Sequence, residues 1–203
     1  MARLLPLAVL AALLAGCGGT TAQQVEVPAQ QTMKRFAGGE LKPPRPAPPI
    51  ALHDAAGRPV TLAGQRGRYV LVTFIYTHCP DVCPLITQNL NSALRQLGGA
   101  RNQVRVLAVS VDPKGDTAAA VRRYAAQREL LPEFRYLIGS RPALRRTWAA
   151  WHVLAVQRNP ELVDHVAYTA LIDRRGKQRV LYDSQVKARQ VLHDLRVLMR
   201  TRN

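Results

Sequence analysis

The spacing of hydrophobic and polar positions changes from block to block along the chain, and each spacing predicts a different element. Short apolar alternations at 50–54 and 59–63 flank a cluster of turn residues, which predicts a β-hairpin. The run from Tyr69 to Thr77 consists of β-branched and aromatic residues without polar alternation. Because such strands are buried on both faces, we expect a central strand that leads directly to Cys79.

The apolar residues after Cys83 recur at steps of three and four, which predicts an amphipathic helix that ends near Gly98 and Gly99. The positions that share this face are Leu85, Ile86, Leu90, Leu94 and Leu97. Later segments predict strands at 104–112, 134–139, 152–156, 167–173 and 178–183, and helices at 117–128, 141–151 and 187–200. Strands and helices that alternate in this way are typical of a three-layer α/β domain.

The N-terminal segment predicts export. Residues 1–16 have a short basic start and an apolar run too short to span a bilayer, and they end on small residues before Cys17. This pattern resembles a bacterial lipoprotein signal, which is cut so that Cys17 carries lipid; an ordinary secretory signal is the alternative. Residues 17–46 are rich in Gly, Gln and Pro and predict a tether, which leaves 47–203 as the folded domain.

Composition and charge argue against some classes of function. A chain of 203 residues with 47% hydrophobic content can bury one sizeable core. The formal net charge of +16 would suit a nucleic-acid binder. Predicted export and the lack of a basic block interleaved with aromatic residues argue against nucleic acid as a partner. The arginines instead suit a domain that lies close to an anionic membrane surface.

Cys79 and Cys83 carry the candidate chemistry of the exported domain. Cysteine pairs in exported proteins are most often structural disulfides. A ring of about five residues, however, gains only roughly 2 kcal/mol from loop closure. Thiols at the point where a buried strand enters a helix face N–H groups and the positive end of the helix dipole, which lowers their pKa. The position therefore favours redox chemistry, in which the pair can close as a disulfide, or metal binding.

The available ligands narrow the kind of metal. A structural zinc site takes four protein ligands and this domain has one cysteine pair, whereas two thiolates suit Cu(I) and Cu(II) would require an imidazole as well. His165 is the candidate imidazole, because it lies in a loop that leads into a strand and Asp164 can orient its ring. The residues alone leave His165 open as a ligand or an ordinary loop histidine. The remaining histidines are interpreted as solvated, packed or tuning side chains: His53, His78, His152 and His193.

Three motifs together resemble the Sco (SenC) family of copper proteins. They are YTHCPDVCP at 76–84, SVDPKGDT at 110–117 and VDHVAYTALIDRRGK at 163–177, in family order and at family-like spacings. The hairpin and strand before the first motif match as well, so the resemblance covers nearly the whole domain. It implies a thioredoxin-like three-layer fold with an N-terminal β-hairpin extension.

The resemblance also implies a function. Copper would be bound by Cys79, Cys83 and His165, with Asp81 as an acidic residue that tunes the site. The domain would face the periplasm and deliver copper to, or prepare the thiols of, the copper A centre in subunit II of cytochrome c oxidase. A second periplasmic copper chaperone is a further candidate partner. Val166 and Gly115 depart from the residues common in the family, although neither change removes a ligand.

A thiol-disulfide oxidoreductase is the alternative function. Cys79 would be the attacking thiolate, and Cys83 would resolve the mixed disulfide. Catalysts of that fold usually separate the two cysteines by two residues, whereas three residues separate them here. His165 discriminates between the two functions, because copper retention should need it and disulfide exchange should not.

Overall fold

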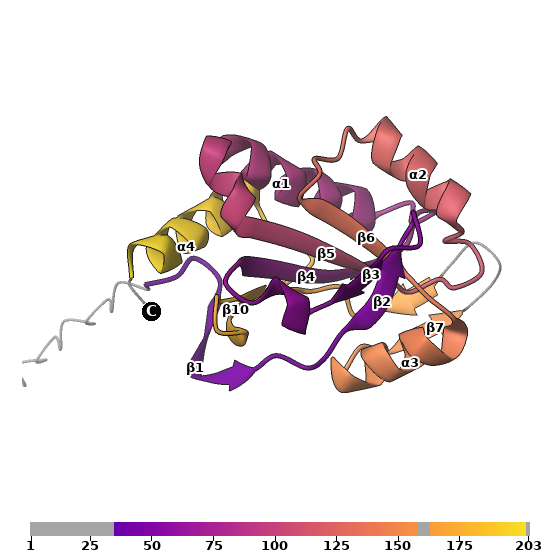
Figure 1. Cartoon of the computed structure of the whole chain (residues 1–203), viewed down its shortest axis with the longest axis horizontal. Helices are drawn as coiled ribbons and strands as arrows, with labels where there is room; N and C mark the ends of the chain where they lie inside the picture. The colour runs from indigo at the N-terminus through magenta and orange to yellow at the C-terminus, as the bar shows by residue number, and fades with distance from the viewer. Residues whose placement is uncertain (1–34, 158–162, 202–203) are drawn as a thin grey trace, which may run out of the picture. The chain divides into compact units, whose positions relative to one another are not determined.

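The computed structural model describes residues 35–157 and 163–201, which lie within one compact unit, Lys34–Asn203. Its core is an eight-stranded sheet in the order β1-β10-β9-β4-β5-β6-β2-β3, and β7 and β8 form a separate two-stranded sheet (Figure 1). The strands are β1 (Gly39–Pro46), β2 (Ala51–Asp54), β3 (Pro59–Thr61), β4 (Tyr69–Ile75), β5 (Val104–Ser110), β6 (Phe134–Ile138), β7 (Ala155–Gln157), β8 (Val163–His165), β9 (Thr169–Ile172) and β10 (Lys177–Tyr182).

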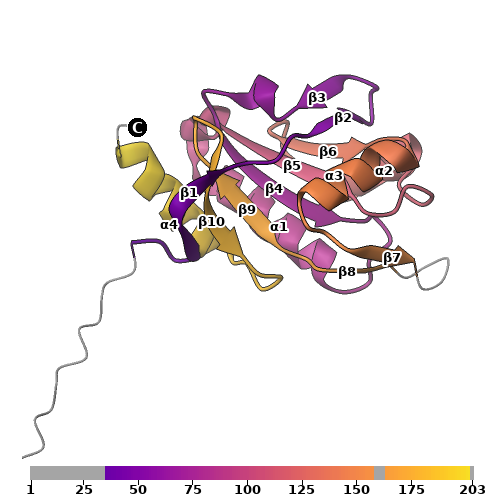
Figure 2. The same ribbon diagram turned by 90° about the horizontal axis from the view of Figure 1, so that it is seen from below.

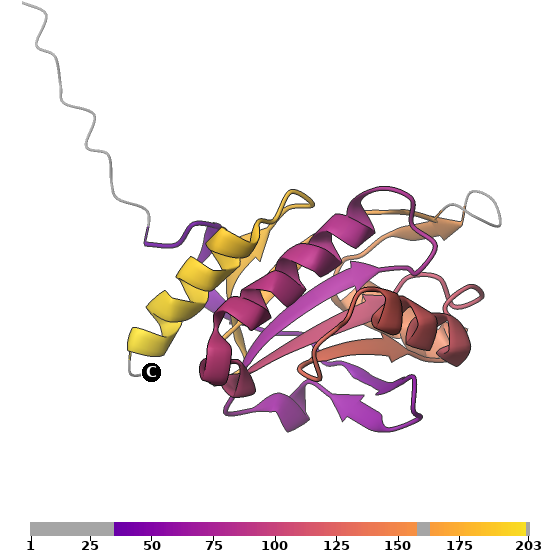
Figure 3. The same cartoon turned by 90° about the horizontal axis from the view of Figure 1, so that it is seen from above.

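Helices cover both faces of the large sheet, which confirms the expected three-layer α/β architecture. The helices are α1 (Val82–Gln96), α2 (Ala118–Gln127), α3 (Arg141–Ala150) and α4 (Ala188–Arg200), with short 3-10 turns at Ala63–Gln65 and Gly98–Gln103. Figures 1 and 3 show α1 and α2 on one face and α3 on the other. Helix α4 packs beside α1. No helix among the described residues is long and apolar enough to cross a bilayer.

The central strand and the helix after it form as the apolar pattern predicts. β4 lies in the sheet between β5, to which it is parallel, and β9, to which it is antiparallel, and all seven of its residues are buried because both faces of the sheet are covered. The predicted hairpin is also present, since β2 pairs with β3 and attaches to the sheet through β6. In α1 the predicted apolar face is buried at Ile86, Leu90 and Leu94. Leu85 was wrongly assigned to that face, because its side chain is 53% exposed.

The predicted boundary between tether and domain is wrong. Residues 39–46, which the sequence analysis assigned to the tether, form β1 and pair antiparallel with β10, so the last part of the predicted tether belongs to the sheet. Phe36, farther upstream, is 1% exposed. A Cβ at Gly38 would overlap the side chains of Val180 and Tyr182, so only glycine lets this segment lie so close to β10. The predicted signal peptide and Cys17 lie outside the described residues.

The segment around His165 also differs from the sequence prediction. The strand expected at 152–156 is observed as β7, which begins at Ala155, and the loop expected to contain His165 includes a second strand, β8. The two strands pair antiparallel, with Ala155 opposite His165 and Gln157 opposite Val163. Figures 2 and 3 show this small sheet beside the N-terminal end of α1, where the cysteines lie. The backbone of His165 therefore lies on a paired strand rather than in an open loop.

Candidate metal centre

The two cysteines lie where β4 ends and α1 begins. Cys79 is in the connecting loop and is 9% exposed, whereas Cys83 is in the first turn of α1 and is completely buried. Their spacing of four residues, with α1 starting between them, brings the two sulfurs onto one side of the helix end. Both are thiols in this structure. The site is thus a dithiol set at the edge of the protein core.

A hydrogen bond between the two thiols shifts their pKa values in opposite directions. The Cys83 thiol donates to Cys79 Sγ and, although burial opposes ionisation, lowers the pKa of Cys79 to about 6. The backbone N–H groups of Asp81 and Cys83 and the Tyr76 hydroxyl also donate to Cys79 Sγ and favour its thiolate. The same interaction and burial raise the pKa of Cys83 far above its ordinary value. At neutral pH the pair therefore holds one thiolate and one thiol.

Tyr76 links this pair to the strand that carries His165. Its hydroxyl accepts a hydrogen bond from the backbone N–H of Val163 and donates one to Cys79 Sγ. Burial is the first cause that raises the pKa of Tyr76 to about 12, so the hydroxyl keeps its proton and remains a donor. Val163 lies two residues before His165 and is 4% exposed. The fold therefore brings the backbone of β8 next to the dithiol.

A buried carboxyl, Asp116, holds the loop between β4 and the cysteines in place. It accepts hydrogen bonds from the backbone N–H and the hydroxyl of Thr77, at 2.8 and 2.7 Å. The hydroxyls of Ser110 at the end of β5 and Tyr136 in β6 donate to its other oxygen, at 2.6 and 2.8 Å. Burial raises the pKa of Asp116, and these four donors offset part of that effect. Asp116 thus fastens the loop to two neighbouring strands.

The loop after β5 explains why glycine stands at position 115. Asp112 Oδ1 accepts the backbone N–H groups of Lys114 and Gly115, at 3.1 and 3.0 Å, and closes a tight turn. A Cβ at Gly115 would overlap Asp112 Oδ2 and would come within 3.2 Å of His78 Nδ1. His78 is exposed, and its Nδ1 lies 3.0 Å from Thr77 Oγ1. Gly115, which differs from the residue common in the family, is therefore required by the tight turn beside the cysteine loop.

Exposed apolar side chains flank the same region. Among the described residues, the large hydrophobic side chains that are exposed are Leu85, Leu154, Val156 and Val166, at 53, 69, 38 and 60%. Leu154 directly precedes β7, Val156 lies within it, Val166 directly follows β8, and Leu85 is in the first turns of α1. Exposed apolar side chains gathered in this way are typical of surfaces that another molecule covers.

The structure brings some of the predicted site residues together and leaves others untested. The Asp81 carboxylate makes no capping hydrogen bond to α1, whereas the backbone N–H of Asp81 donates to Cys79 Sγ. The side chains of Asp164 and His165 lie outside those that the structure describes, so their predicted roles remain hypotheses. Among the described side chains, no three metal-ligating groups converge. The other four histidines lie on separate exposed surfaces: His53, His78, His152 and His193.

The roles of Tyr76, Thr77 and Asp116 were not predicted from the sequence. Each lies inside a motif that was singled out, but the hydrogen bonds join residues far apart in the chain. Asp116 and Thr77 are separated by 39 positions. The available signal was an aspartate in the loop directly after a buried strand, where side chains of neighbouring strand ends meet.

The acidity of Cys79 predicts how its reactivity depends on pH. In the reduced, metal-free Cys17→Ser chain, the rate of alkylation of Cys79 by iodoacetamide should rise with a midpoint near pH 6, where its pKa lies, because the thiolate is the nucleophile. Cys83 should react later at every pH, because it is buried and its pKa is raised. Mass spectrometry of quenched samples measures both rates. A Cys79 midpoint near the ordinary thiol value of 9.0 would contradict the hydrogen-bonded pair.

Comparison with known proteins supports the resemblance. The family model described as SCO1/SenC matches residues 40–200. The solution structures of apo Sco1 from Thermus thermophilus share 35% identity with the chain, cover 82% of it and 99% of that protein, and superpose with a TM-score of 0.71. The structure of Bradyrhizobium japonicum ScoI with copper bound shares 28% identity, covers 75% of this chain and 98% of that one, and gives a TM-score of 0.67.

A curated relative agrees with these structures. The mitochondrial SCO2 homolog of Bos taurus is 30% identical over 154 residues, which cover 72% of this chain and 57% of that protein, so the chain spans little more than half of its length. The similar Sco structures confirm the expected thioredoxin-like α/β fold with its N-terminal hairpin extension. Because the family model covers most of the chain, the chain belongs to the SCO1/SenC family.

Proposed function

We propose that this protein is a copper metallochaperone that binds copper through Cys79, Cys83 and His165. The observation that carries the proposal is the hydrogen-bonded dithiol, to which Tyr76 joins the strand of His165. Solved relatives, among them the Bradyrhizobium japonicum protein, are described as copper-bound, which supports copper as the cargo. Asp81 and Asp164 are proposed to influence the charge and orientation of the ligands without binding the metal themselves.

The donor set fits copper. Thiolate sulfurs are soft ligands that select Cu(I), and an added imidazole also makes Cu(II) acceptable. Cys79 is a thiolate at neutral pH, so one ligand is already deprotonated. Cys83 must release its proton on binding, because its raised pKa keeps it a thiol in the reduced protein. Copper uptake should therefore release a proton, and a returning proton should favour release of copper.

The proposed acceptor is the copper A centre in subunit II of cytochrome c oxidase. A structural relative from the Sco family is described as a member of a family of cytochrome c oxidase assembly proteins, which supports this assignment. The domain either transfers copper or reduces the acceptor cysteines before copper arrives. A second periplasmic copper chaperone is proposed to load the domain. The exposed Leu85, Leu154 and Val166 beside the dithiol suit an encounter with another protein.

We further propose that the chain is exported and held at the periplasmic face of a bacterial membrane. Residues 1–16 would act as a lipoprotein signal, and Cys17 would carry the lipid. The residues that follow Cys17 would form the tether, which ends before β1 because that strand belongs to the sheet.

Copper retention in single variants tests the three-ligand proposal. Reduced Cys17→Ser chain is loaded with Cu(I) or Cu(II), and affinity is measured by competition with a chelator, together with the sulfur-to-copper absorption band. His165→Ala should weaken Cu(II) binding by roughly a hundredfold or more and shift the band, because an imidazole is lost from the metal. Cys79→Ser and Cys83→Ser should each abolish the band.

His152→Ala is the matched control, since His152 is an exposed histidine after α3. It should bind both oxidation states as the parent chain does. If His165→Ala retained copper as tightly as His152→Ala, the three-ligand site would be rejected.

The unequal acidities of the two thiols favour a second candidate function, disulfide exchange. The Cys79 thiolate would attack a target disulfide and release one target thiolate. Cys83 would then lose its proton and attack Cys79 Sγ, which releases the second target thiolate and leaves a Cys79–Cys83 disulfide. The target gains two electrons and this domain loses them. In this function His165→Ala should leave the rate of target reduction unchanged, while Cys79→Ser abolishes it.

A further inference from the structure

Five arginines crowd the end of the sheet where β4, β5 and β6 begin. We call Arg58, Arg66, Arg68, Arg105 and Arg135 the arginine cluster. Arg68 directly precedes β4, and Arg105 and Arg135 are the second residues of β5 and β6. Arg105 is opposite Val70, and Arg135 is opposite Leu107. Because side chains alternate along strands, Arg68, Arg105 and Arg135 lie on one face of three adjacent strands.

Two hollows open among these side chains, and Arg105 lines both. One, of ≈ 520 Å³, is lined by Arg66, Gly67, Arg68, Asn102, Gln103 and Arg105. The other, of ≈ 210 Å³, lies between the tip of the β2–β3 hairpin and the sheet, and its charged lining residues are Asp54, Arg58, Arg105 and Arg135. The cluster therefore borders two hollows, with Arg105 between them, that a small anion can enter.

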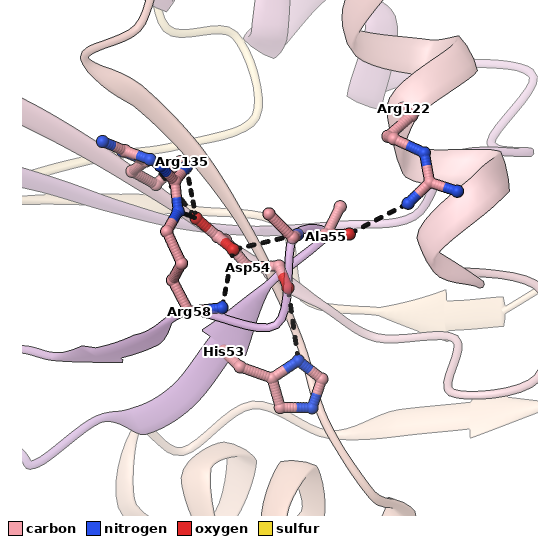
Figure 4. Close-up of polar contacts among 7 residues, drawn as sticks. His53, Asp54, Ala55, Arg58, Arg122 and Arg135 are labelled. Carbon is pink, nitrogen blue, oxygen red and sulfur yellow. Dashed lines mark hydrogen bonds and ion pairs between the residues drawn. The ribbon is translucent and has the colours of Figure 1, made fainter.

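The carboxylate that lines the smaller hollow, Asp54, already accepts hydrogen bonds at both oxygens. Its Oδ2 takes Arg58 Nε and the Arg58 terminal nitrogen, both at 2.8 Å, and an Arg135 terminal nitrogen at 3.3 Å (Figure 4). Its Oδ1 accepts the backbone N–H groups of Ala56 and Arg58, at 2.9 and 3.1 Å. The single negative charge of Asp54 is thus shared between the guanidinium groups of Arg58 and Arg135.

The other three arginines of the cluster form no ion pair with a described carboxylate. Arg66 lies over the backbone of Gly176, where a Cβ would overlap its guanidinium, and Arg68 and Arg105 form no ion pair. Arg105 is half-buried and donates only to the carbonyl oxygens of Asn102 and Val104, at 3.1 and 2.7 Å. Burial and then the nearby Arg68 lower the pKa of Arg105; Glu133 partly offsets this effect, and Arg135 adds to it.

We propose that the arginine cluster is a binding site for a phosphate-type anion, supplied by free inorganic phosphate or by the headgroup of an anionic phospholipid. Guanidinium groups match phosphate oxygens with paired N–H donors, and several arginines around one hollow suit an anion with more than one negative charge better than a single carboxylate. An anion there would supply the negative charge that Asp54 alone does not provide to Arg68 and Arg105.

This site is separate from the dithiol. Arg68 and Cys79 lie beyond opposite ends of β4, a strand of seven residues, so about 20 Å of strand separates the two ends. Anion binding and copper binding therefore succeed or fail independently. Loss of one in a variant leaves the other as an internal check that the domain is folded.

Isothermal titration of the reduced Cys17→Ser chain with inorganic phosphate tests the proposal. Saturable binding is expected, and Arg68→Gln combined with Arg105→Gln should weaken it by roughly tenfold or more, because charge-assisted hydrogen bonds are lost. Arg145→Gln with Arg146→Gln is the control, since it removes the same charge from two exposed positions of α3. Arg68→Gln alone, which breaks no ion pair, keeps the test valid if the double variant fails to fold.

Vesicle sedimentation identifies the source of the anion. The chain is mixed with vesicles of phosphatidylcholine alone or of phosphatidylcholine with phosphatidylglycerol, whose acyl chains are the same. A preference for phosphatidylglycerol that the cluster variant loses and the control variant keeps assigns the site to lipid headgroups, and phosphate binding without this preference assigns it to the free anion. Absence of both, or equal losses in cluster and control variants, overturns the proposal.

Discussion

Asp116→Ala is expected to lower the free energy of unfolding by about 3 kcal/mol, because it leaves up to four buried donors without an acceptor. The donors are Thr77 N–H, Thr77 Oγ1, Ser110 Oγ and the Tyr136 hydroxyl. For a domain of this size the melting temperature should fall by about 6–12 °C. The variant should also bind copper more weakly, because Thr77 lies two residues before Cys79 and is no longer held.

The dependence of this effect on pH separates Asp116 from an ordinary surface carboxylate. Burial raises its pKa above the unfolded value. A group with a raised folded pKa contributes stability that is fully present below the unfolded pKa and is lost as the pH rises through the folded pKa. The stability difference between parent and Asp116→Ala should therefore widen as the pH falls, which thermal unfolding over a pH series measures.

Two further variants calibrate the result. Asp116→Asn keeps one oxygen acceptor and the shape of the side chain, so it should lose about half as much stability as Asp116→Ala. Asp183→Ala removes an exposed carboxylate that accepts only Gln185 N–H, at 2.8 Å, and should change stability by less than about 1 kcal/mol. Equal melting temperatures for Asp116→Ala and Asp183→Ala would show that the loop does not depend on Asp116.

The elements that the sequence predicted well are those whose pattern is local. β4 is a continuous apolar run because both of its faces are covered, and α1 repeats apolar residues because one face is buried. The positions of the two cysteines follow from the same pattern. The residues that connect a buried strand to the next helix lie at the end of that strand. Periodicity alone was therefore enough to place Cys79 and Cys83.

β1 was not predicted, because its three prolines are atypical of a strand. Pro43, Pro44 and Pro46 lack the N–H groups of ordinary strand residues, and β1 lies at the edge of the sheet, where such residues are tolerated. Its pairing with β10 also shifts register between Glu40 and Arg45, so no alternation of apolar and polar residues survives. The composition resembled a linker, while tertiary pairing made it a strand.

β8 and the Asp116 interactions could not be predicted for different reasons. β8 has three residues and is stabilised by pairing with β7, which is too little for a periodic signal. Asp116 acts through partners up to 39 positions away, and nothing in the sequence near Asp116 identifies Thr77 as its partner. In both cases the information lies in the topology of the sheet, which brings distant strand ends together.

Asp194→Ala is expected to lower the free energy of unfolding by about 3 kcal/mol and to loosen the segment before β1. Asp194 is completely buried in α4 and accepts the backbone N–H groups of Ala37 and Gly38, at 2.7 and 3.0 Å, and the Tyr182 hydroxyl at 2.8 Å. Without the carboxylate these three donors must remain unsatisfied or leave the core. Chemical denaturation measures the loss of stability.

Limited proteolysis tests whether the loosened part is this segment. In Asp194→Ala, cleavage near Arg35 should accelerate while cleavage within α1 does not, because the released backbone can detach and satisfy its N–H groups with water. His193→Ala is the control, since His193 is exposed on the same helix and contacts only the Arg35 carbonyl of that segment, at 3.3 Å. If Asp194→Ala and His193→Ala were cleaved alike, the buried carboxylate would not be what holds the chain against the sheet, and Phe36 packing would have to account for it.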